Sequence, residues 1–319
     1  MRLGRLAIHR AWYGVTLLMT AVLMTGCAAR DGTEPISAAV AAPAAVAAPA
    51  VQPVSPASPP VTAKAPSSDL SPLRKQLAEY LSDQDGTYGV YIVDLATGKG
   101  VGVNSDKVFP AASTFKLPMS LYILDQVAKG KASLDEKITY SEADYEEGTG
   151  TLQDWISEGE ALKVRELIEL AITQSDNIAT QMLLRRFGVT NVYDYMHTLG
   201  GHVTHYDEGV IGTTPKEMAA YMRSAQGSSV LKDPKLRQFL IRSLEQTAFE
   251  DRTAAGVPNG IKVAHKIGTL PNVVNDVALV EAPGHPFIIS AFSVDVDDEV
   301  APAVITEVTR KVYDFLTAS

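Results

Sequence analysis

Two β-hairpin patterns stand near opposite ends of residues 69–319, and most of the chain between them carries helical patterns. The first hairpin, at 87–109, has its turn at Thr97–Gly100, and the second, at 275–294, turns at Pro283-Gly284. Strands so far apart in sequence can bury their apolar faces by sharing one sheet. The sequence therefore predicts an α+β fold, in which the N- and C-terminal segments form an antiparallel sheet around a helical middle.

The helical patterns have apolar residues three or four positions apart. They cover 72–82, 115–129, 163–174, 177–187, 191–199, 215–225, 233–245 and 304–316. No internal repeat is present, so we expect one folded unit.

The first 26 residues have the composition of an export signal. Arg2, Arg5 and Arg10 precede an apolar stretch that ends in small residues. The only cysteine, Cys27, follows in LMTGC, which resembles the lipobox of bacterial lipoproteins with Met24 in place of the usual leucine. That resemblance implies a lipid attached to Cys27, and a buried thiol is the alternative. Without a second cysteine, no intrachain disulfide can form.

Residues 37–67 are rich in alanine and proline and almost without charged or aromatic residues. Such a segment cannot bury enough apolar surface to offset its ordering entropy. We expect a signal peptide at 1–26, a tether at 27–68 and a folded domain at 69–319. The domain would be held at the extracytoplasmic face of the bacterial cell envelope.

The formal net charge of −9 makes the surface acidic. Phosphate groups of nucleic acids and anionic lipids are repelled by such a surface. We therefore expect no nucleic-acid partner, contact with the membrane only through the lipid anchor, and a monomer.

Ser113 and Lys116 stand three residues apart at the start of an apolar helical pattern. This spacing puts both side chains on one helix face, where the amine can reach the serine oxygen. A serine becomes nucleophilic when an adjacent base takes its proton, and burial lowers the pKa of an amine enough for that role. Phe115, Leu117 and Met119 can supply the apolar surroundings. Helix capping by Ser113 is the alternative.

Two further motifs follow in order. S-D-N lies at 175–177, between two helical patterns, and K-I-G lies at 266–268 in a strand pattern, followed by Thr269. S-x-x-K, S-D-N and K-T-G are the motifs of penicillin-recognising serine enzymes, with Ile267 here replacing threonine. Over 69–319 the chain resembles class A β-lactamases and their relatives, also in KVRELIEL, GTTPKEMA and NDVALV.

The resemblance implies a β-lactamase/transpeptidase-like fold and an acyl-enzyme mechanism. Ser113 would be the acylated nucleophile and Lys116 its proton acceptor. Ser175 would pass the proton towards the leaving nitrogen. Tyr145 and the residues after it, 146–153, fall where the family has a loop beside the active site, although a simple turn explains their glycines equally well.

Substrate contacts are implied in the same way. Asn177 would hold the side-chain amide of the substrate, and Lys266 and Thr269 would bind its carboxylate. The oxyanion hole would use the main-chain N–H of the nucleophile and that of a residue after Gly268, taken as Leu270.

The family's omega loop is shortened. In the resembled enzymes, E-x-x-L-N in this loop carries the glutamate that activates water for hydrolysis of the acyl-enzyme. The interval 188–215 lacks this motif, and Glu208 is its only glutamate. Glu208 either takes over the role or is a solvated turn residue.

Histidines supply no convincing metal site. His202, His205 and Asp207 lie close in sequence but have no fourth ligand, so neither metal nor cofactor is expected. His265 precedes Lys266 in a strand pattern, so we expect its side chain on the opposite face, at the surface.

Three functions fit these residues. The leading prediction is a serine hydrolase that is acylated by β-lactams and hydrolyses the β-lactam amide. The alternatives are a D-alanyl-D-alanine peptidase or transpeptidase acting on peptidoglycan stem peptides, and a sensor that stays acylated. Whole-domain similarity favours the first function, and the missing E-x-x-L-N favours the others.

The lipobox resemblance predicts that Cys27→Ala releases the protein from the membrane fraction or stalls its processing, because the variant cannot carry the lipid. Fractionation and the mass of the mature chain measure this. A Cys27→Ala protein of mature size that still sediments with membranes would contradict the prediction.

Overall fold

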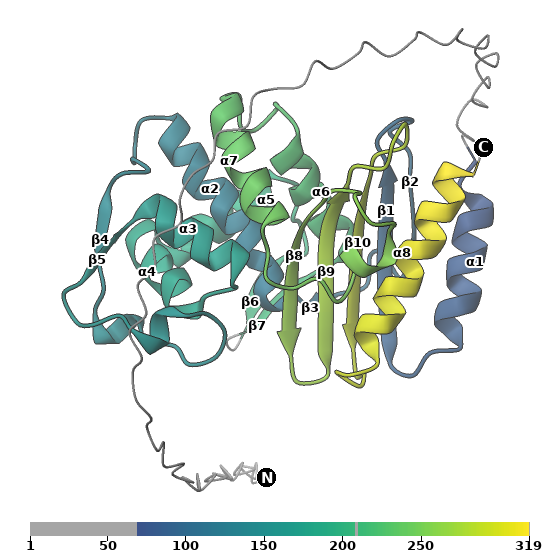
Figure 1. Ribbon diagram of the computed structural model, residues 1–319, viewed down its shortest axis with the longest axis horizontal. Coiled ribbons are helices and arrows are strands. Elements are labelled where there is room, and N and C mark those ends of the chain that lie inside the picture. Colours follow the sequence, from purple (N-terminus) through teal and green to yellow (C-terminus); the bar gives the residue numbers. More distant parts are fainter. Residues whose placement is uncertain (1–68, 208–209, 319) are drawn as a thin grey trace, which may run out of the picture. The chain divides into compact units, whose positions relative to one another are not determined.

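An antiparallel five-stranded sheet with the order β2-β1-β10-β9-β8 forms the centre of the computed structural model, which describes residues 69–207 and 210–318 (Figure 1). Its strands are β1 (Thr87–Asp94), β2 (Gly100–Val103), β8 (Val263–Leu270), β9 (Val273–Val280) and β10 (Phe287–Val294). β1 pairs with β10, so the two ends of the domain meet in the sheet. The predicted α+β architecture is confirmed.

Two terminal helices, α1 (Ser71–Ser82) and α8 (Ala301–Thr317), lie side by side on one face of the sheet (Figure 1). Leu73 and Leu77, four residues apart on α1, are fully buried against this face. Apolar residues of α8 such as Val308 complete this layer. The outer face of the sheet is therefore covered.

The other face of the sheet carries the helical middle of the chain (Figure 1). Its helices are α2 (Lys116–Ala128), α3 (Val164–Thr173), α4 (Asn177–Phe187), α5 (Val189–Thr198), α6 (Pro215–Gln226) and α7 (Pro234–Glu245). The residues of α2 are buried on almost all sides, from Lys116 to Asp125. α2 is thus the central helix of this layer, and the S-x-x-K motif ends at its first residue, Lys116.

Side-chain caps fix where three helices begin. The carboxylate of Asp176 accepts a hydrogen bond from Ala179 N (2.8 Å) at the start of α4. Thr214 and Asp233 cap α6 and α7 in the same way, and a proline follows each of these two caps. The predicted helices are all present with small shifts at their ends. In the described part of the chain, no helix is long and apolar enough to span a membrane.

Two small sheets were not predicted. They comprise β3 (Phe109–Pro110), β7 (Val210–Thr213) and β6 (His205–Asp207), and separately β4 (Lys137–Thr139) and β5 (Ala161–Lys163). Segments of two to four residues are too short to show a strand period. The first hairpin also ends earlier than predicted, because Asn104 has a φ of 50° and turns the chain after β2.

The prediction that His265 lies at the surface is wrong. Its side chain is fully buried, and Nδ1 lies 3.1 Å from both carboxylate oxygens of Asp276 on β9. The expectation of an exposed face assumed a sheet open on one side. Here both faces are covered, so a histidine facing away from Lys266 is still inside the protein.

The buried His265–Asp276 pair makes the free energy of unfolding depend on pH. Burial alone would lower the pKa of His265, but the charge and hydrogen bond of Asp276 outweigh burial and raise it. For Asp276, burial alone would raise the pKa. The charge of His265 and the hydrogen bonds that the Asp276 carboxylate accepts outweigh burial and lower the pKa. The stabilisation is therefore complete below the unfolded pKa of histidine and is lost as pH rises through the raised folded value. At the acidic end it is lost as pH falls through the lowered pKa of Asp276.

We expect the stability difference between the wild type and His265→Gln to be largest near about pH 5.5 and to shrink towards about pH 9. Urea unfolding across this range measures it. The exposed His202, changed to Gln, is the control and should show no such trend. A difference that grows with pH would contradict the assignment of the ion pair.

Candidate active site

Ser113 lies in a short 3-10 turn, Ala112–Phe115, directly before α2. Ala112 has a φ of 46°, a conformation that non-glycine residues seldom adopt outside functional sites. The side-chain amide of Asn275 on β9 donates to Pro110 O (2.8 Å), which ties this turn to the sheet. The sheet and the helical layer together hold Ser113 in place.

Gly268 allows strand β8 to approach the nucleophile. A Cβ atom at position 268 would lie 2.8 Å from Ala111 O and 3.0 Å from Ser113 N, closer than real side chains come. Only glycine fits here, and this steric limit explains the glycine at the third position of the K-I-G motif. The backbone of β8 therefore runs directly beside the backbone of Ser113.

Lys116 joins the S-x-x-K and S-D-N motifs. Its Nζ donates to Ser175 O (2.6 Å), to Ser175 Oγ (3.2 Å) and to Asn177 Oδ1 (2.9 Å). Ser175 has a φ of 55°, which turns the end of α3 into the start of α4 and aims both groups at the lysine. Three predicted site residues from two separate motifs thus converge on one amine.

The surroundings of Lys116 suit a proton acceptor. Its side chain is 1% exposed, and burial lowers the pKa of the amine to about 7, against the opposing charges of Glu146 and Asp176. Near neutral pH, a substantial fraction of the amine is therefore unprotonated. An unprotonated amine can take the proton of a serine or water hydroxyl.

Lys266 lies fully buried on β8, with Nζ donating to Ile267 O (2.9 Å). Burial and the charges of Lys116 and Arg252 lower the pKa of Lys266 well below its usual value, although Asp276 opposes them. Two buried lysines near each other disfavour two positive charges. An anionic group bound beside them would favour the charged form of Lys266, which suits the carboxylate-binding role expected for it.

Arg252 belongs to this site and was missed by the sequence analysis. Its Nη1 donates to Asn275 O (2.6 Å) and Gly268 O (3.2 Å), and its Nη2 donates to Thr269 Oγ1 (2.7 Å). Because the arginine occupies an acceptor position of Thr269, the hydroxyl proton of Thr269 is free to point elsewhere. The sequence carries no signal for this role, since two of the three acceptors are main-chain carbonyls.

One cavity of about 580 Å³ contains Ser113 and Lys116. Its polar lining residues include Ser113, Lys116, Glu146, Glu147, Thr149, Asn177, Thr180, Gln181 and Thr269. Its apolar lining residues are Phe115, Leu184, Val189, Val192, Tyr193, Ile211, Leu270 and Pro271. The cavity is therefore polar around the catalytic groups and apolar towards α5 and β7.

The predicted site residues divide into three groups. Asn177, Thr269 and Leu270 line the cavity with Ser113 and Lys116. The residues Ser175, Lys266 and Gly268 lie outside its lining, with Ser175 and Lys266 buried beside it. Glu208 and Cys27 lie outside the described residues.

The segment around His202 and His205 shows no metal site. His202 is exposed, and His205 Nδ1 lies 2.8 Å from Val203 O. Among residues 69–207 and 210–318, no group of three or more histidine, cysteine or acidic side chains could hold a metal ion.

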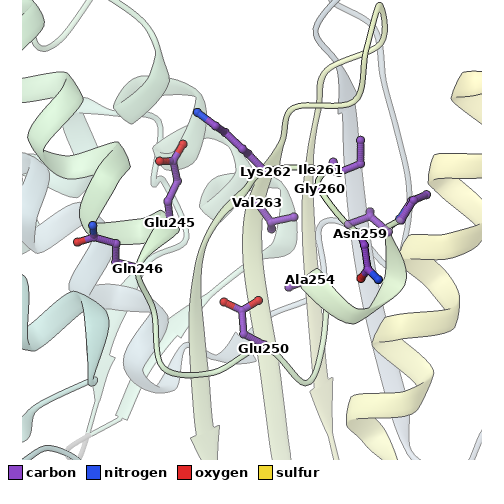
Figure 2. Close-up of a pocket in the computed structure, with 11 residues that line it drawn as sticks. Glu245, Gln246, Glu250, Ala254, Asn259, Gly260, Ile261, Lys262 and Val263 are labelled. Atoms are coloured by element: carbon purple, nitrogen blue, oxygen red, sulfur yellow. The ribbon is translucent and has the colours of Figure 1, made fainter. Parts of the chain in front are cut away.

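A second cavity, of about 460 Å³, lies at the other end of β8 and contains none of these catalytic groups. Figure 2 shows Glu245, Glu250 and Lys262 around it, at the end of α7 and the start of β8. None of the residues that line it belongs to the three motifs.

Comparisons with known proteins identify the family. A model of the Beta-lactamase enzyme family matches residues 72–316. The chain belongs to this family. β-Lactamase AST-1 of Nocardia asteroides is 30% identical over 274 residues, which cover 81% of this chain and 87% of that protein.

Solved structures extend the similarity to the fold. A structure of PBP-A is 29% identical with a TM-score of 0.73, covering 77% of this chain and 96% of that one. An ancestral class A β-lactamase is 32% identical with a TM-score of 0.71, covering 76% and 99%. A point variant of PBP-A, 28% identical to this chain, was solved as an acyl-enzyme complex with penicillin G. The predicted class A resemblance is confirmed, and the protein is a β-lactamase-like serine hydrolase.

The lowered pKa of Lys116 predicts that the acylation rate constant rises with pH through about 7, because only the unprotonated amine can accept a proton. Lys116→Ala should slow acylation by about 10²–10⁴-fold and abolish this rise. Lys266→Ala should instead mainly raise KM for anionic substrates. Stopped-flow acylation by a chromogenic cephalosporin measures both variants. Identical kinetic changes in the two variants would contradict their separate roles.

Proposed function

We propose that this protein forms an acyl-enzyme with β-lactams on Ser113 and hydrolyses the β-lactam amide. The observation that carries the proposal is the buried amine of Lys116, which has a lowered pKa and hydrogen bonds to Ser175 and Asn177. Few structural roles would require a lysine to be desolvated in this way beside a serine.

In acylation, Ser113 Oγ attacks the β-lactam carbonyl carbon while Lys116 takes the hydroxyl proton. The C–N bond of the lactam then breaks, and the nitrogen receives a proton through Ser175. The 3.2 Å hydrogen bond from Lys116 Nζ to Ser175 Oγ provides the path for that proton. The step ends with an ester on Ser113 and a protonated ring nitrogen.

The substrate carboxylate would be bound by Lys266 and the hydroxyl of Thr269. Arg252 supports this role, because its donation to Thr269 Oγ1 leaves the hydroxyl proton for an incoming anion. The amide side chain of the substrate would meet Asn177, which lines the cavity.

The oxyanion hole would use Ser113 N–H and one N–H of β8. Ile267 O accepts a hydrogen bond from Lys266 Nζ, so this carbonyl faces away from β9. In an antiparallel strand, backbone groups two residues apart face the same side. We therefore infer that Thr269 N–H, rather than Leu270 N–H, points towards the reacting carbonyl.

A second candidate function is a peptidase or transpeptidase acting on D-alanyl-D-alanine stem peptides, and a sensor that stays acylated is a related case. The observation that favours them is the interval 188–215, which lacks E-x-x-L-N. The similarity to PBP-A covers as much of the chain as the similarity to β-lactamases. Either alternative would use the same acylation step.

We further propose that the domain acts outside the cytoplasm, anchored by lipid on Cys27 and separated from the bilayer by residues 27–68. Both β-lactams and peptidoglycan stem peptides are available there. The export-signal composition of residues 1–26 supports this proposal.

Intact-mass measurements of the protein mixed with benzylpenicillin test the function. The wild type should gain one penicillin mass and lose it with time, and Ser113→Ala should gain none. Ser113 caps neither the 3-10 turn nor α2, so the variant should remain folded. An adduct that persists would indicate a peptidase or sensor. Labelling of Ser113→Ala would contradict the whole assignment.

A further inference from the structure

We propose that Glu146 activates the water that hydrolyses the acyl-enzyme. The proposal rests on the proposed function, because it concerns the fate of the ester on Ser113. A water molecule attacking an ester needs a base within hydrogen-bond reach, directly or through a second water. The structure places a carboxylate of this kind on the loop before the S-D-N motif.

Glu146 and Glu147 are the only carboxylic acids that line the active-site cavity among the described residues. Asp176, the acid of the S-D-N motif, is 1% exposed and uses its two oxygens to accept hydrogen bonds from Ala179 N and Leu152 N. Both oxygens of Asp176 are therefore occupied by backbone N–H groups, so this carboxylate is not available to activate water. Among the described residues, the candidates for a base that activates water are therefore the two glutamates and Lys116.

Helix α4 holds the carboxylate of Glu146 in this cavity. Gln181 Nε2 donates a hydrogen bond to Glu146 Oε2. Gln181 lies one turn after Asn177, so the two side chains share a face of α4, and both line the cavity. Glu146 therefore sits on the same wall as Asn177, which accepts a hydrogen bond from Lys116.

The loop that carries Glu146 is fastened to the S-D-N motif at three points. Asn177 N donates to Thr149 O (3.0 Å), and Thr149 Oγ1 donates to Ser175 O (2.7 Å). Asn177 Nδ2 donates to Glu147 O (3.2 Å). The main chain on the C-terminal side of Glu146 is thus positioned by the catalytic residues themselves.

The charge of Glu146 also reaches the catalytic amine. Of the two carboxylates that oppose the lowered pKa of Lys116, Glu146 acts more strongly than the buried Asp176. The carboxylate therefore shares the cavity with the amine and favours its charged form.

The proposed step balances as follows. A water oxygen forms a bond to the ester carbonyl carbon while Glu146 takes one proton from that water. The bond between this carbon and Ser113 Oγ then breaks, and Ser113 Oγ takes a proton from Lys116, which receives the proton of Glu146 in turn. The products are free serine and the hydrolysed, ring-opened acid, and Glu146 and Lys116 return to their starting protonation states.

Glu146→Gln tests this step, because glutamine keeps the size and the contact with Gln181 but cannot accept a proton from water. The matched variant is Glu147→Gln, which removes the neighbouring carboxylate from the same cavity. The quantity measured is the half-life of the penicillin adduct, followed by intact mass at about pH 8.5. At this pH, Lys116 is mostly unprotonated in all variants. Acylation rates are measured by stopped flow at the same pH and, for every variant, from about pH 6 to about pH 9.

We expect Glu146→Gln to lengthen the adduct half-life by about 100-fold or more, with acylation within about twofold of the wild type. Glu147→Gln should leave both within about twofold, and Glu146→Asp should recover part of the hydrolysis. Equal half-lives in the wild type and Glu146→Gln would overturn the proposal, as would equal losses in Glu146→Gln and Glu147→Gln. A change confined to the pH dependence of acylation would also overturn it, since Glu146 would then only adjust the pKa of Lys116.

These outcomes are separate from a failure of the proposed function. If the wild type forms no adduct, the acylation chemistry itself is wrong. If the wild type forms an adduct that never decays, acylation stands and no residue, Glu146 included, serves as an effective base.

Discussion

The hydrogen bonds of the buried Lys116 amine hold the active site together. They join the first turn of α2 to the junction of α3 and α4, fifty-nine residues further along the chain at Ser175. A buried amine is costly unless its donors are satisfied, so the folded state fixes the positions of Ser175 and Asn177 relative to Ser113. The same burial lowers the pKa of the amine and makes it a base. The burial of this one amine therefore accounts both for the positions of Ser175 and Asn177 and for the lowered pKa of Lys116.

A further cluster of charged side chains lies on and behind strand β8. Lys266, Arg252, His265 and Asp276 are all buried near one another. Lys266 and Arg252 donate to backbone carbonyls, and His265 pairs with Asp276. The pair of His265 and Asp276 faces away from the cavity, while Arg252 reaches from this cluster to Thr269. A substrate anion at Lys266 would thus be bound at the end of a network that is already arranged in the free protein.

Sequence reasoning identified the parts of the site that form motifs, because S-x-x-K, S-D-N and K-I-G each require particular side chains at fixed spacing. It also identified the shared sheet of the two chain ends. It missed Arg252, whose partners are largely backbone carbonyls of residues that only the fold brings near. His265 was misplaced because α8 and its neighbours cover a sheet face that a strand pattern alone leaves open. Residues 146–153 were placed either beside the active site or in a simple turn, and no role was predicted for Glu146, because its contact with Gln181 spans 35 residues.

Strand β8 is the edge strand of the five-stranded sheet, and its outer side faces the segment that carries Ser113. An edge strand has backbone N–H and C=O groups that no neighbouring strand pairs. An extended peptide can add to such an edge as one more strand. The amide of a β-lactam and the backbone of a stem peptide present the same donor and acceptor groups to β8. Either molecule, bound along β8, would extend the sheet by one more strand and would bring its scissile amide to the side chains around Ser113.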